Sequence, residues 1–446
     1  MSTTTTSSRH FHDHSISSII VGRRTNKKTK LGSLRLKYSS PSSSTTTSCD
    51  GFGNDSNAST RREILIKTSA VLSLVLSQGM SEARANDDDE EQKNERKKVI
   101  LITGANSGIG KTCAVELARL GHTVILHART KEKQEKIGRE IVAKQEDADV
   151  VLCGNGCDLN DLIEVREYSE RVLEYLSSSS SSVEEGGANG SRMKKIDALI
   201  LNAGIMAAPL EYTQQGHESH FGINHLAHYL LYENLKPALF VRDNDKAGEP
   251  ARVISVSSLL CVLADFSFDA NDLDFRLGRK YGKWEAYAQS KACNVLMMDD
   301  LAERNDKSKL VANSFHPGIV TTDLVRYSFP NLIASKRDPE KEKWIREQAH
   351  KLGLRDADEG CKTHVWLATS DEALKKTGEF FVDPGLIYPG ATHKELVSAG
   401  DWFLVSGEEP FAKELNFPNR LFDWRNESNR VKLREISKDM VSDFLL

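Results

Sequence analysis

Short apolar runs alternate with longer segments of mixed polarity along most of the chain. Six runs are rich in Val, Ile and Leu, which is typical of buried strands. They are Lys98–Ile102, Thr123–Leu126, Val150–Leu152, Ile196–Leu201, Val253–Val256 and Lys309–Phe315. Three of the intervening segments have helical periodicity: one that ends at Leu120, then Arg129–Glu146 and Leu162–Leu176. Strands that alternate with helices predict an α/β fold with a parallel sheet of βαβ units.

A glycine-rich turn follows the first predicted strand and precedes the first predicted helix. Gly104, Gly108 and Gly110 are spaced G-x-x-x-G-x-G. Glycine permits a tight turn and lets the backbone approach a pyrophosphate, while the N-terminus of the helix presents unpaired N–H groups to the anion. The turn therefore predicts a dinucleotide site on a Rossmann-type, doubly wound parallel sheet.

The second predicted strand ends in His127-Ala128-Arg129. An enzyme that uses NAD usually carries Asp or Glu at this place, whereas Arg129 offers a cation to the 2′-phosphate of NADP. We therefore expect NADP as the cofactor. The alternative is that Arg129 only begins the charged face of the next helix.

A tyrosine and a lysine stand four residues apart further along the chain. Tyr287 and Lys291 share one face if this segment is helical. The phenol of a free tyrosine has a pKa of about 10, and a neighbouring ammonium favours the phenolate. The pair is a candidate for proton transfer, although Y-x-x-x-K alone is common by chance.

Four further motifs accompany this pair, and most of them follow a predicted strand. They are Asn202-Ala203-Gly204, Asn224 within G-I-N-H-L, Ser257-Ser258, and Pro317-Gly318. Together with T-G-x-x-x-G-I-G and Y-x-x-x-K, they resemble the short-chain dehydrogenase/reductase family over about residues 97–325. The resemblance implies a Rossmann fold and an NAD(P)-dependent oxidoreductase.

Several local sequences are similar to the retinol dehydrogenase-like branch of that family. They are Gly104–Lys111, Phe221–Leu226, Asp272-Leu273, His316–Gly318 and Glu359–Asp383. The last of these implies a helix and a strand near the C-terminal end of the domain. The long segment between the predicted catalytic serine and tyrosine is also usual for this branch.

The resemblance implies roles for four catalytic residues. Tyr287 would be the general acid for carbonyl reduction or the base for alcohol oxidation. Ser258, rather than Ser257, would hydrogen-bond the substrate oxygen. Lys291 would tune Tyr287 and hold the nicotinamide ribose. Asn224 would support a water-linked proton route to Lys291.

The resemblance also implies the cofactor contacts. Asp158 would contact the adenine, Asn202 and Gly204 would border the adenine ribose, and Thr322 would contact the carboxamide or a phosphate. The expected cofactor-binding residues are Gly104, Asn106, Ser107, Gly108, Ile109, Gly110, Arg129, Asp158, Asn202, Ala203, Gly204, Tyr287, Lys291, Pro317, Gly318 and Thr322. We expect His225 and His228 to pack within a helix, and we expect no metal site.

The first 85 residues differ in composition from the rest. They carry 12 Lys and Arg against 5 Asp and Glu, and 25 of the first 60 residues are Ser or Thr. Arg61-Arg62 precedes a short apolar core, Ala70–Leu76, and an A-R-A sequence ends at Ala85. These features predict a transit peptide followed by a twin-arginine-type signal, and hence a plastid protein of the thylakoid lumen. A stromal location, a membrane anchor and a mitochondrial presequence are the alternatives.

The predicted organisation has four parts. A targeting leader occupies residues 1–85 and a charged linker occupies 86–96, followed by one NAD(P)-binding domain over 97–400 and a C-terminal extension over 401–446. Ser177–Gly187 is a low-complexity insertion before the fourth predicted strand, so we expect it to be a surface loop.

Composition excludes several classes of protein. No apolar run among the 446 residues reaches the roughly 20 residues that span a bilayer, so the mature chain is expected to lack a transmembrane span. The net charge of −4 gives no electrostatic footprint for nucleic acid. The 7 cysteines are too scattered for a disulfide framework. Cys153 and Cys157 are either a thiol pair or ordinary buried residues.

These features predict an NADP-dependent oxidoreductase that interconverts an alcohol and an aldehyde or ketone. The expected partner is a lipophilic small molecule of retinoid, isoprenoid or pigment type, and a homo-oligomer is left open. The alternatives are an NADPH-sensing regulatory subunit of a plastid complex and a protochlorophyllide reductase-like enzyme.

Overall fold

The structure, a computed structural model, describes residues 96–178, 193–240, 248–266, 272–318, 320, 322, 324, 355–387 and 424–446. The described residues from Lys97 onward fall in one compact unit. The predicted leader and almost all of the predicted linker lie outside the described residues, as does the Ser-rich insertion beyond Ser178. The predicted domain limits at residues 400 and 401 lie outside them as well.

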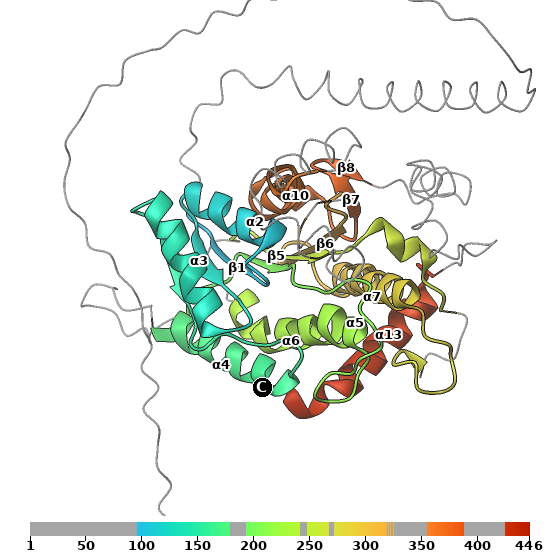
Figure 1. The fold of residues 1–446 in the computed structure, drawn as a ribbon. Coiled ribbons are helices and arrows are strands. Elements are labelled where there is room, and N and C mark those ends of the chain that lie inside the picture. The colour runs from blue at the N-terminus through green and yellow to red at the C-terminus, as the bar shows by residue number, and fades with distance from the viewer. Residues whose placement is uncertain are drawn as a thin grey trace, which may run out of the picture. The chain divides into compact units, whose positions relative to one another are not determined.

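An eight-stranded sheet runs through the centre of the unit (Figure 1). Its strand order is β3-β2-β1-β4-β5-β6-β7-β8, and each neighbouring pair is parallel except β7 and β8. The strands are β1 (Val99–Ile102), β2 (Thr123–Leu126), β3 (Asp149–Leu152), β4 (Ala198–Leu201), β5 (Ala251–Val256), β6 (Leu310–Phe315), β7 (Phe380–Asp383) and β8 (Leu386–Ile387). The predicted doubly wound α/β fold is confirmed.

The first six strands coincide with the six predicted apolar runs. The differences are at the ends, since β5 begins two residues earlier at Ala251 and β4 begins at Ala198. β7 ends at Asp383, where the resemblance placed a strand. The short antiparallel strand β8 was not predicted, because two residues at a sheet edge leave no periodic pattern.

Helices cover both faces of the sheet because successive strand residues point to opposite sides. On β1, Ile100 and Ile102 pack in the core beneath α2, α3 and α10, whereas Leu101 packs in the core beneath α4, α6 and α7. These helices are α2 (Gly108–Arg119), α3 (Lys131–Lys144), α4 (Leu162–Ser178), α6 (Ala227–Leu239), α7 (Lys283–Arg304) and α10 (Ala357–Thr369). Figure 1 shows α2 and α10 on one side of the sheet, and α6 and α7 on the other.

Several short helical turns lie between the longer elements or follow them. They are α5 (Ser219–Phe221), the π-helical turn η2 (Gly222–Leu226), and the 3₁₀ turns η3 (Leu259–Leu263), η6 (Ala373–Lys375) and η7 (Ser442–Phe444). α5, η2 and α6 follow one another without a break, so they act as one irregular helix beside α7.

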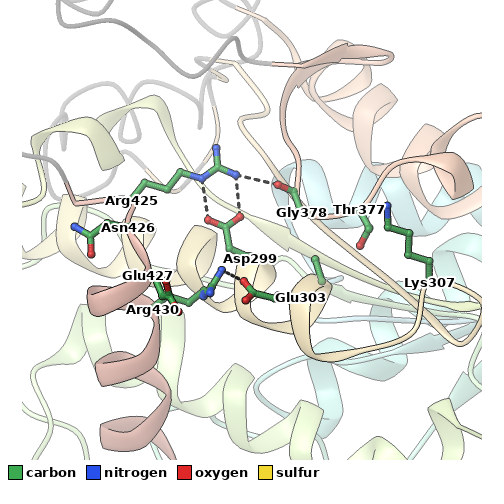
Figure 2. A pocket seen from close by; sticks show the side chains of 10 residues that line it. Asp299, Glu303, Lys307, Thr377, Gly378, Arg425, Asn426, Glu427 and Arg430 are labelled. Atoms are coloured by element: carbon green, nitrogen blue, oxygen red, sulfur yellow. Dashed lines mark hydrogen bonds and ion pairs between the residues drawn. The ribbon is translucent and has the colours of Figure 1, made fainter.

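The predicted C-terminal extension includes helix α13 (Glu427–Met440), which packs against α7. Arg425 forms two hydrogen bonds of 2.8 Å with the carboxylate of Asp299, and Arg430 forms an ion pair with Glu303. Figure 2 shows both arginines directed at these carboxylates of α7. The cavity beside them has a volume of about 410 Å³, and the described residues that line it include none of the predicted site residues.

Candidate active site

Most of the predicted site residues lie at or beyond the carboxyl ends of the parallel strands. The strand order changes direction between β1 and β4, because β2 and β3 extend the sheet on one side of β1 and the later strands on the other. Open α/β sheets bind ligands in the crevice at such a switch point. The predicted residues therefore lie where this class of fold binds its ligands.

The glycine-rich turn joins β1 to α2 in a conformation that suits glycine. Gly104 and Gly108 have φ values of +70° and +53°, which side chains disfavour. A Cβ on Gly110 would lie 2.4 Å from Nδ2 of Asn202 and 2.5 Å from the carbonyl oxygen of Gly104, so no larger residue fits there. Ser107 is the N-cap residue of α2, and its side chain makes no capping bond. The Ser107 side chain thus leaves the first N–H groups of α2 available, and a pyrophosphate fits that place.

The Asn202-Ala203-Gly204 motif is tied directly to this turn. Oγ1 of Thr103 accepts hydrogen bonds from the N–H groups of Asn202 and Ala203 at 2.8 and 2.9 Å. Nδ2 of Asn202 donates to the carbonyl of Thr103 at 2.7 Å, and its Oδ1 lies 3.1 Å from Nε2 of His364 on α10. The side chain of Asn202 is therefore engaged with protein groups on both sides.

His127 supports the turn as well, and the sequence analysis gave it no role. It directly follows β2, is buried, and its Nδ1 accepts a hydrogen bond of 3.2 Å from the N–H of Gly104. Burial lowers its pKa to about 4, so the ring is neutral and can accept that bond at neutral pH. The only sequence signal was its position at the end of the strand next to β1.

Arg129 and Asp158 are brought together from two different strand ends. Nε of Arg129 lies 3.6 Å from Oδ1 of Asp158, and both side chains are partly exposed. The N–H of Asp158 donates to Glu164 at 2.7 Å, which fixes the loop after β3. The two residues predicted to contact the adenosine half of the cofactor are thus neighbours, and the cation is accessible to a ligand.

The predicted catalytic residues converge on α7. Tyr287 and Lys291 are buried one helical turn apart, with Nζ of Lys291 5.8 Å from the centre of the Tyr287 ring. Ser258 shares a hydrogen bond with the Tyr287 side chain. In contrast, the hydroxyl of Ser257 donates to the carbonyl of Lys291 at 2.7 Å. Ser258 is therefore the serine that lies beside the phenol, as the sequence analysis preferred.

Burial dominates the electrostatics of this group. It raises the pKa of Tyr287 above its usual value, and the hydrogen bond with Ser258 acts in the opposite direction. It lowers the pKa of Lys291 to about 8, while Nζ donates to the carbonyl of Val256 at 2.8 Å. Lys291 thus stays mainly protonated at neutral pH and supplies positive charge close to the phenol.

Asn224 lies in the π-helical turn η2 and bridges two parts of the site. Its Oδ1 accepts from the N–H of Ile205 at 2.8 Å, and its Nδ2 lies 3.1 Å from the carbonyl of Ile205 and 2.9 Å from Oγ of Ser290. Ser290 in turn donates to the carbonyl of Tyr287 at 2.8 Å. Asn224 therefore ties the loop at Ile205 to helix α7 close to Tyr287.

The segment after β6 lies against the glycine-rich turn. A Cβ on Gly108 would lie 3.1 Å from the Cβ of Thr322, so these two predicted cofactor residues are adjacent. Gly318 has a φ of +85°, and a Cβ there would lie 2.5 Å from the side chain of Arg355. Pro317, which precedes it, is buried.

The two histidines of the G-I-N-H-L-A-H segment pack in the core, as expected. His225 lies 2.8 Å from Oγ of Ser437 on α13. His228 lies 2.9 Å from Oγ1 of Thr103 and 3.0 Å from the carbonyl of Asn224, so it links the glycine-rich turn to the helix that carries Asn224. Burial lowers the pKa of both rings to about 3.

Thiols and metal ligands add little to the site. Cys153 and Cys157 are buried and free, and burial raises the pKa of Cys153 to about 12. Across the described ranges there is no cluster of three His, Cys, Asp or Glu side chains that could hold a metal ion. Nor do those ranges contain a helix long and apolar enough to cross a membrane.

The chain is similar in sequence to known dehydrogenases. A family model described as short chain dehydrogenase matches residues 98–268. Retinol dehydrogenase 13 of Homo sapiens is 37% identical over 231 residues, which cover 52% of this chain and 61% of that protein. Retinol dehydrogenase 12 of Mus musculus is 36% identical over 286 residues, which cover 64% of this chain and 78% of that protein. A solved structure of an uncharacterized protein from Mycobacterium paratuberculosis is 28% identical, with a TM-score of 0.44, and the match covers 72% of this chain and 95% of that one.

The chain belongs to the short-chain dehydrogenase/reductase family, which consists of oxidoreductases that use NAD(P). Within that family it belongs to the retinol dehydrogenase-like branch, as the local sequences predicted.

Proposed function

We propose that this protein is an NADP-dependent enzyme that interconverts a lipophilic alcohol and its aldehyde or ketone. The observation that carries the proposal is the buried group of Ser258, Tyr287 and Lys291 at the switch point of the sheet. A bound nicotinamide would supply the hydride, and the protein would supply the proton and the geometry.

In carbonyl reduction, Tyr287 donates its phenolic proton to the substrate oxygen. A buried phenol alone gives up a proton reluctantly, since the phenolate is poorly solvated there. The ammonium of Lys291 offsets this cost because an opposite charge favours the phenolate. Ser258 hydrogen-bonds the same substrate oxygen and stabilises the charge that develops on it.

The cofactor preference rests on Arg129. Its guanidinium lies at the end of β2, where the adenosine ribose is bound in this class of fold, and the side chain is about half exposed. A 2′-phosphate would form charge-assisted hydrogen bonds with it. Within the described part of the chain, the phosphate would compete for Arg129 with the carboxylate of Asp158, which lies 3.6 Å away.

The substrate preference rests on the apolar side chains around the phenol. Ala207 and Trp284 are buried against Tyr287, and Met206, Leu260 and Leu263 pack against them. Such a wall favours an apolar substrate that presents a single oxygen to Ser258 and Tyr287.

The test is a screen of the purified protein with NADPH and NADH against retinal, isoprenoid aldehydes and small polar aldehydes. We expect NADPH oxidation with the lipophilic aldehydes. In the same assay, Tyr287→Phe should lower kcat about 10²- to 10⁴-fold without weakening NADPH binding. Tyr168→Phe is the matched control, because the hydroxyl of Tyr168 is also buried but has no hydrogen-bond partner among the described residues. NADPH binding without turnover across the panel would instead favour nucleotide sensing.

We also propose that the leader directs the protein to the plastid and across the thylakoid membrane. The support is the Ser/Thr-rich segment, Arg61-Arg62 and the A-R-A sequence ending at Ala85. Imported protein should be protease-protected in intact thylakoids, with a mature N-terminus near Asn86. A protease-accessible stromal product that retains Arg61 would contradict this proposal and leave the enzymatic one intact.

A further inference from the structure

A fully buried carboxylate and histidine lie next to the predicted general acid. The side chains of Glu218 and His220 are both 0% exposed, and Oε1 of Glu218 lies 2.7 Å from Nδ1 of His220. The ring of His220 meets that of Tyr287 edge to face, with centroids 6.1 Å apart. No motif in the sequence pointed to either residue.

The hydrogen bonds around this pair fix the tautomer of the histidine. Nε2 of His220 accepts from the N–H of Ala208 at 3.1 Å, so this nitrogen carries no proton. The proton is then on Nδ1 and is donated to Oε1 of Glu218. The other oxygen of Glu218 accepts from the N–H of Phe221 at 2.9 Å. Glu218 therefore uses both oxygens as acceptors, and its Oε1 fixes the tautomer of His220.

His220 and Asn224 hold the two ends of the same short loop. This loop, Ile205–Ala208, follows the Asn202-Ala203-Gly204 motif. Asn224 bonds to both the N–H and the C=O of Ile205. At the other end, His220 holds the N–H of Ala208, and the hydroxyl of Tyr281 donates to its C=O at 2.8 Å. Side chains thus satisfy both backbone groups at each end of the loop.

The middle of the loop has an unfavourable backbone conformation and faces the site. Ala207 has a φ of +50°, which is rare for a residue other than glycine. Such a conformation persists only where the surroundings enforce it. Ala207 is also buried against Tyr287 and Trp284, so a shift of the loop would move the wall beside the phenol.

We propose that His220, held in its Nδ1–H tautomer by Glu218, is a positioning residue that fixes the loop Ile205–Ala208 and the ring of Tyr287 for proton transfer. The proposal rests on the proposed function in one respect, the role of Tyr287 as the general acid. His220 itself touches no reacting atom. It acts through the position of Tyr287 and of the apolar wall.

The first experiment separates the hydrogen bond of His220 from the shape of its ring. His220→Phe keeps an aromatic ring beside Tyr287 but cannot accept from Ala208, whereas His220→Gln offers an acceptor. We expect His220→Phe to lower kcat about 10- to 100-fold, because small displacements of reacting groups have effects of that size. His220→Gln should recover much of the loss. The NADPH dissociation constant should stay within twofold, since the glycine-rich turn is held by other residues.

The matched control is His225→Gln. His225 is another buried histidine of the same irregular helix, but it contacts Ser437 on α13 rather than the loop Ile205–Ala208. The substitution should lower the melting temperature and leave kcat unchanged. Wild-type kcat in His220→Phe would overturn the proposal. Equal losses in His220→Phe and His220→Gln would also overturn it, because the acceptor would then have no role.

A second experiment does not depend on turnover. Long-range ¹H–¹⁵N NMR of the wild-type imidazoles should show fixed Nδ1–H tautomers for His220 and for His228, whose Nδ1 donates to the carbonyl of Asn224, and only the His220 signals should be missing in His220→Gln or His220→Phe. Glu218→Gln should lose the fixed tautomer of His220. The carboxylate of Glu218 accepts hydrogen bonds with both of its oxygens, whereas the amide of glutamine has a single acceptor oxygen. A wild-type His220 protonated on Nε2 would overturn the proposal. If no substrate turns over, the proposed function fails, whereas this measurement still decides whether Glu218 sets His220.

Discussion

Helix α7 takes part in two regions that are stabilised in different ways. Its first half carries Tyr287 and Lys291, and the site around them is built from glycines, backbone groups and neutral histidines. Its second half faces the C-terminal helix α13 and is held by ion pairs (Figure 2). These pairs are Arg425–Asp299, Arg430–Glu303 and Arg434–Asp300.

The difference follows from access to water. Inside the site, burial makes a charge costly, so uncharged groups make most of the hydrogen bonds to the backbone, and the buried carboxylate of Glu218 is satisfied by His220 and the N–H of Phe221. At the contact of α7 and α13 the arginines are partly exposed, so ion pairs cost less to form there and each contributes modestly. The two halves of one helix should therefore respond differently to acid and to substitution.

Acid should produce the largest effect, and part of it should come from the neutral histidines that hold the site. Burial lowers the pKa of His127 to about 4, and that of His228 and His364 to about 3, from 6.5. These neutral rings contribute stability that is fully present above pH 6.5 and is lost as the pH falls towards 4. Each loses about 1 kcal/mol between pH 7 and 5.5, or roughly 3 to 4 kcal/mol for the three.

Thermal unfolding between pH 7.5 and 5 measures this loss. Asp299→Asn should show the same dependence on pH as the wild type, since the substitution leaves the buried histidines and their hydrogen bonds in place. A melting temperature that is flat down to pH 5 would contradict the prediction.

Gly110→Ala should have the next largest effect, on cofactor binding. The new methyl group would lie 2.4 Å from Nδ2 of Asn202 and 2.5 Å from a backbone oxygen, so the turn must shift. Overpacking of this kind costs about 1 to 3 kcal/mol, which corresponds to a roughly 5- to 150-fold weaker affinity for NADPH. Fluorescence titration with NADPH gives the affinity.

Gly138→Ala is the control for that substitution. Gly138 lies within α3, and a methyl group there would meet Leu152 at an ordinary 3.5 Å. It should leave NADPH binding unchanged and add up to about 1 kcal/mol of stability through helix propensity. Wild-type affinity in Gly110→Ala would show that the turn does not hold the pyrophosphate.

Arg129→Asp should shift the choice of cofactor by a smaller amount. A carboxylate in place of the guanidinium repels a 2′-phosphate, so the affinity for NADPH relative to NADH should fall about tenfold. Titration of both cofactors measures the ratio, and Arg139→Asp on the exposed face of α3 should leave it unchanged. An unchanged ratio in Arg129→Asp would mean that the phosphate is held elsewhere.

Asp299→Asn should have the smallest effect, confined to stability. It weakens the bidentate bond with Arg425, at a cost of about 1 kcal/mol, or a few degrees in melting temperature. The kcat should stay within twofold of wild type. Glu116→Gln, in the exposed pair with Arg119, should change the melting temperature even less. A large loss of kcat in Asp299→Asn would show that the two halves of α7 are coupled.

Much of the fold could be predicted from local spacing. Apolar runs of strand length, glycines after the first run and a Tyr–Lys spacing of one helical turn are properties of neighbouring residues, so the chain displays them directly. The doubly wound parallel arrangement also followed, since βαβ units connect in a restricted set of ways, whereas the strand order comes from the structure. The ends of β4 and β5 shifted because pairing with a neighbouring strand, rather than composition, decides where a strand stops.

The supports of the site could not be predicted in this way, because their partners are distant in sequence. Asn202 meets His364 across 162 positions, and His225 meets Ser437 across 212. Only the packing of α10 against the sheet and of α13 against α7 places these groups within hydrogen-bond distance. The sequence by itself determined the chemistry-bearing residues, whose spacing is local. The tertiary structure decided which buried groups hold them, because burial and long-range hydrogen bonds exist only once the chain is folded.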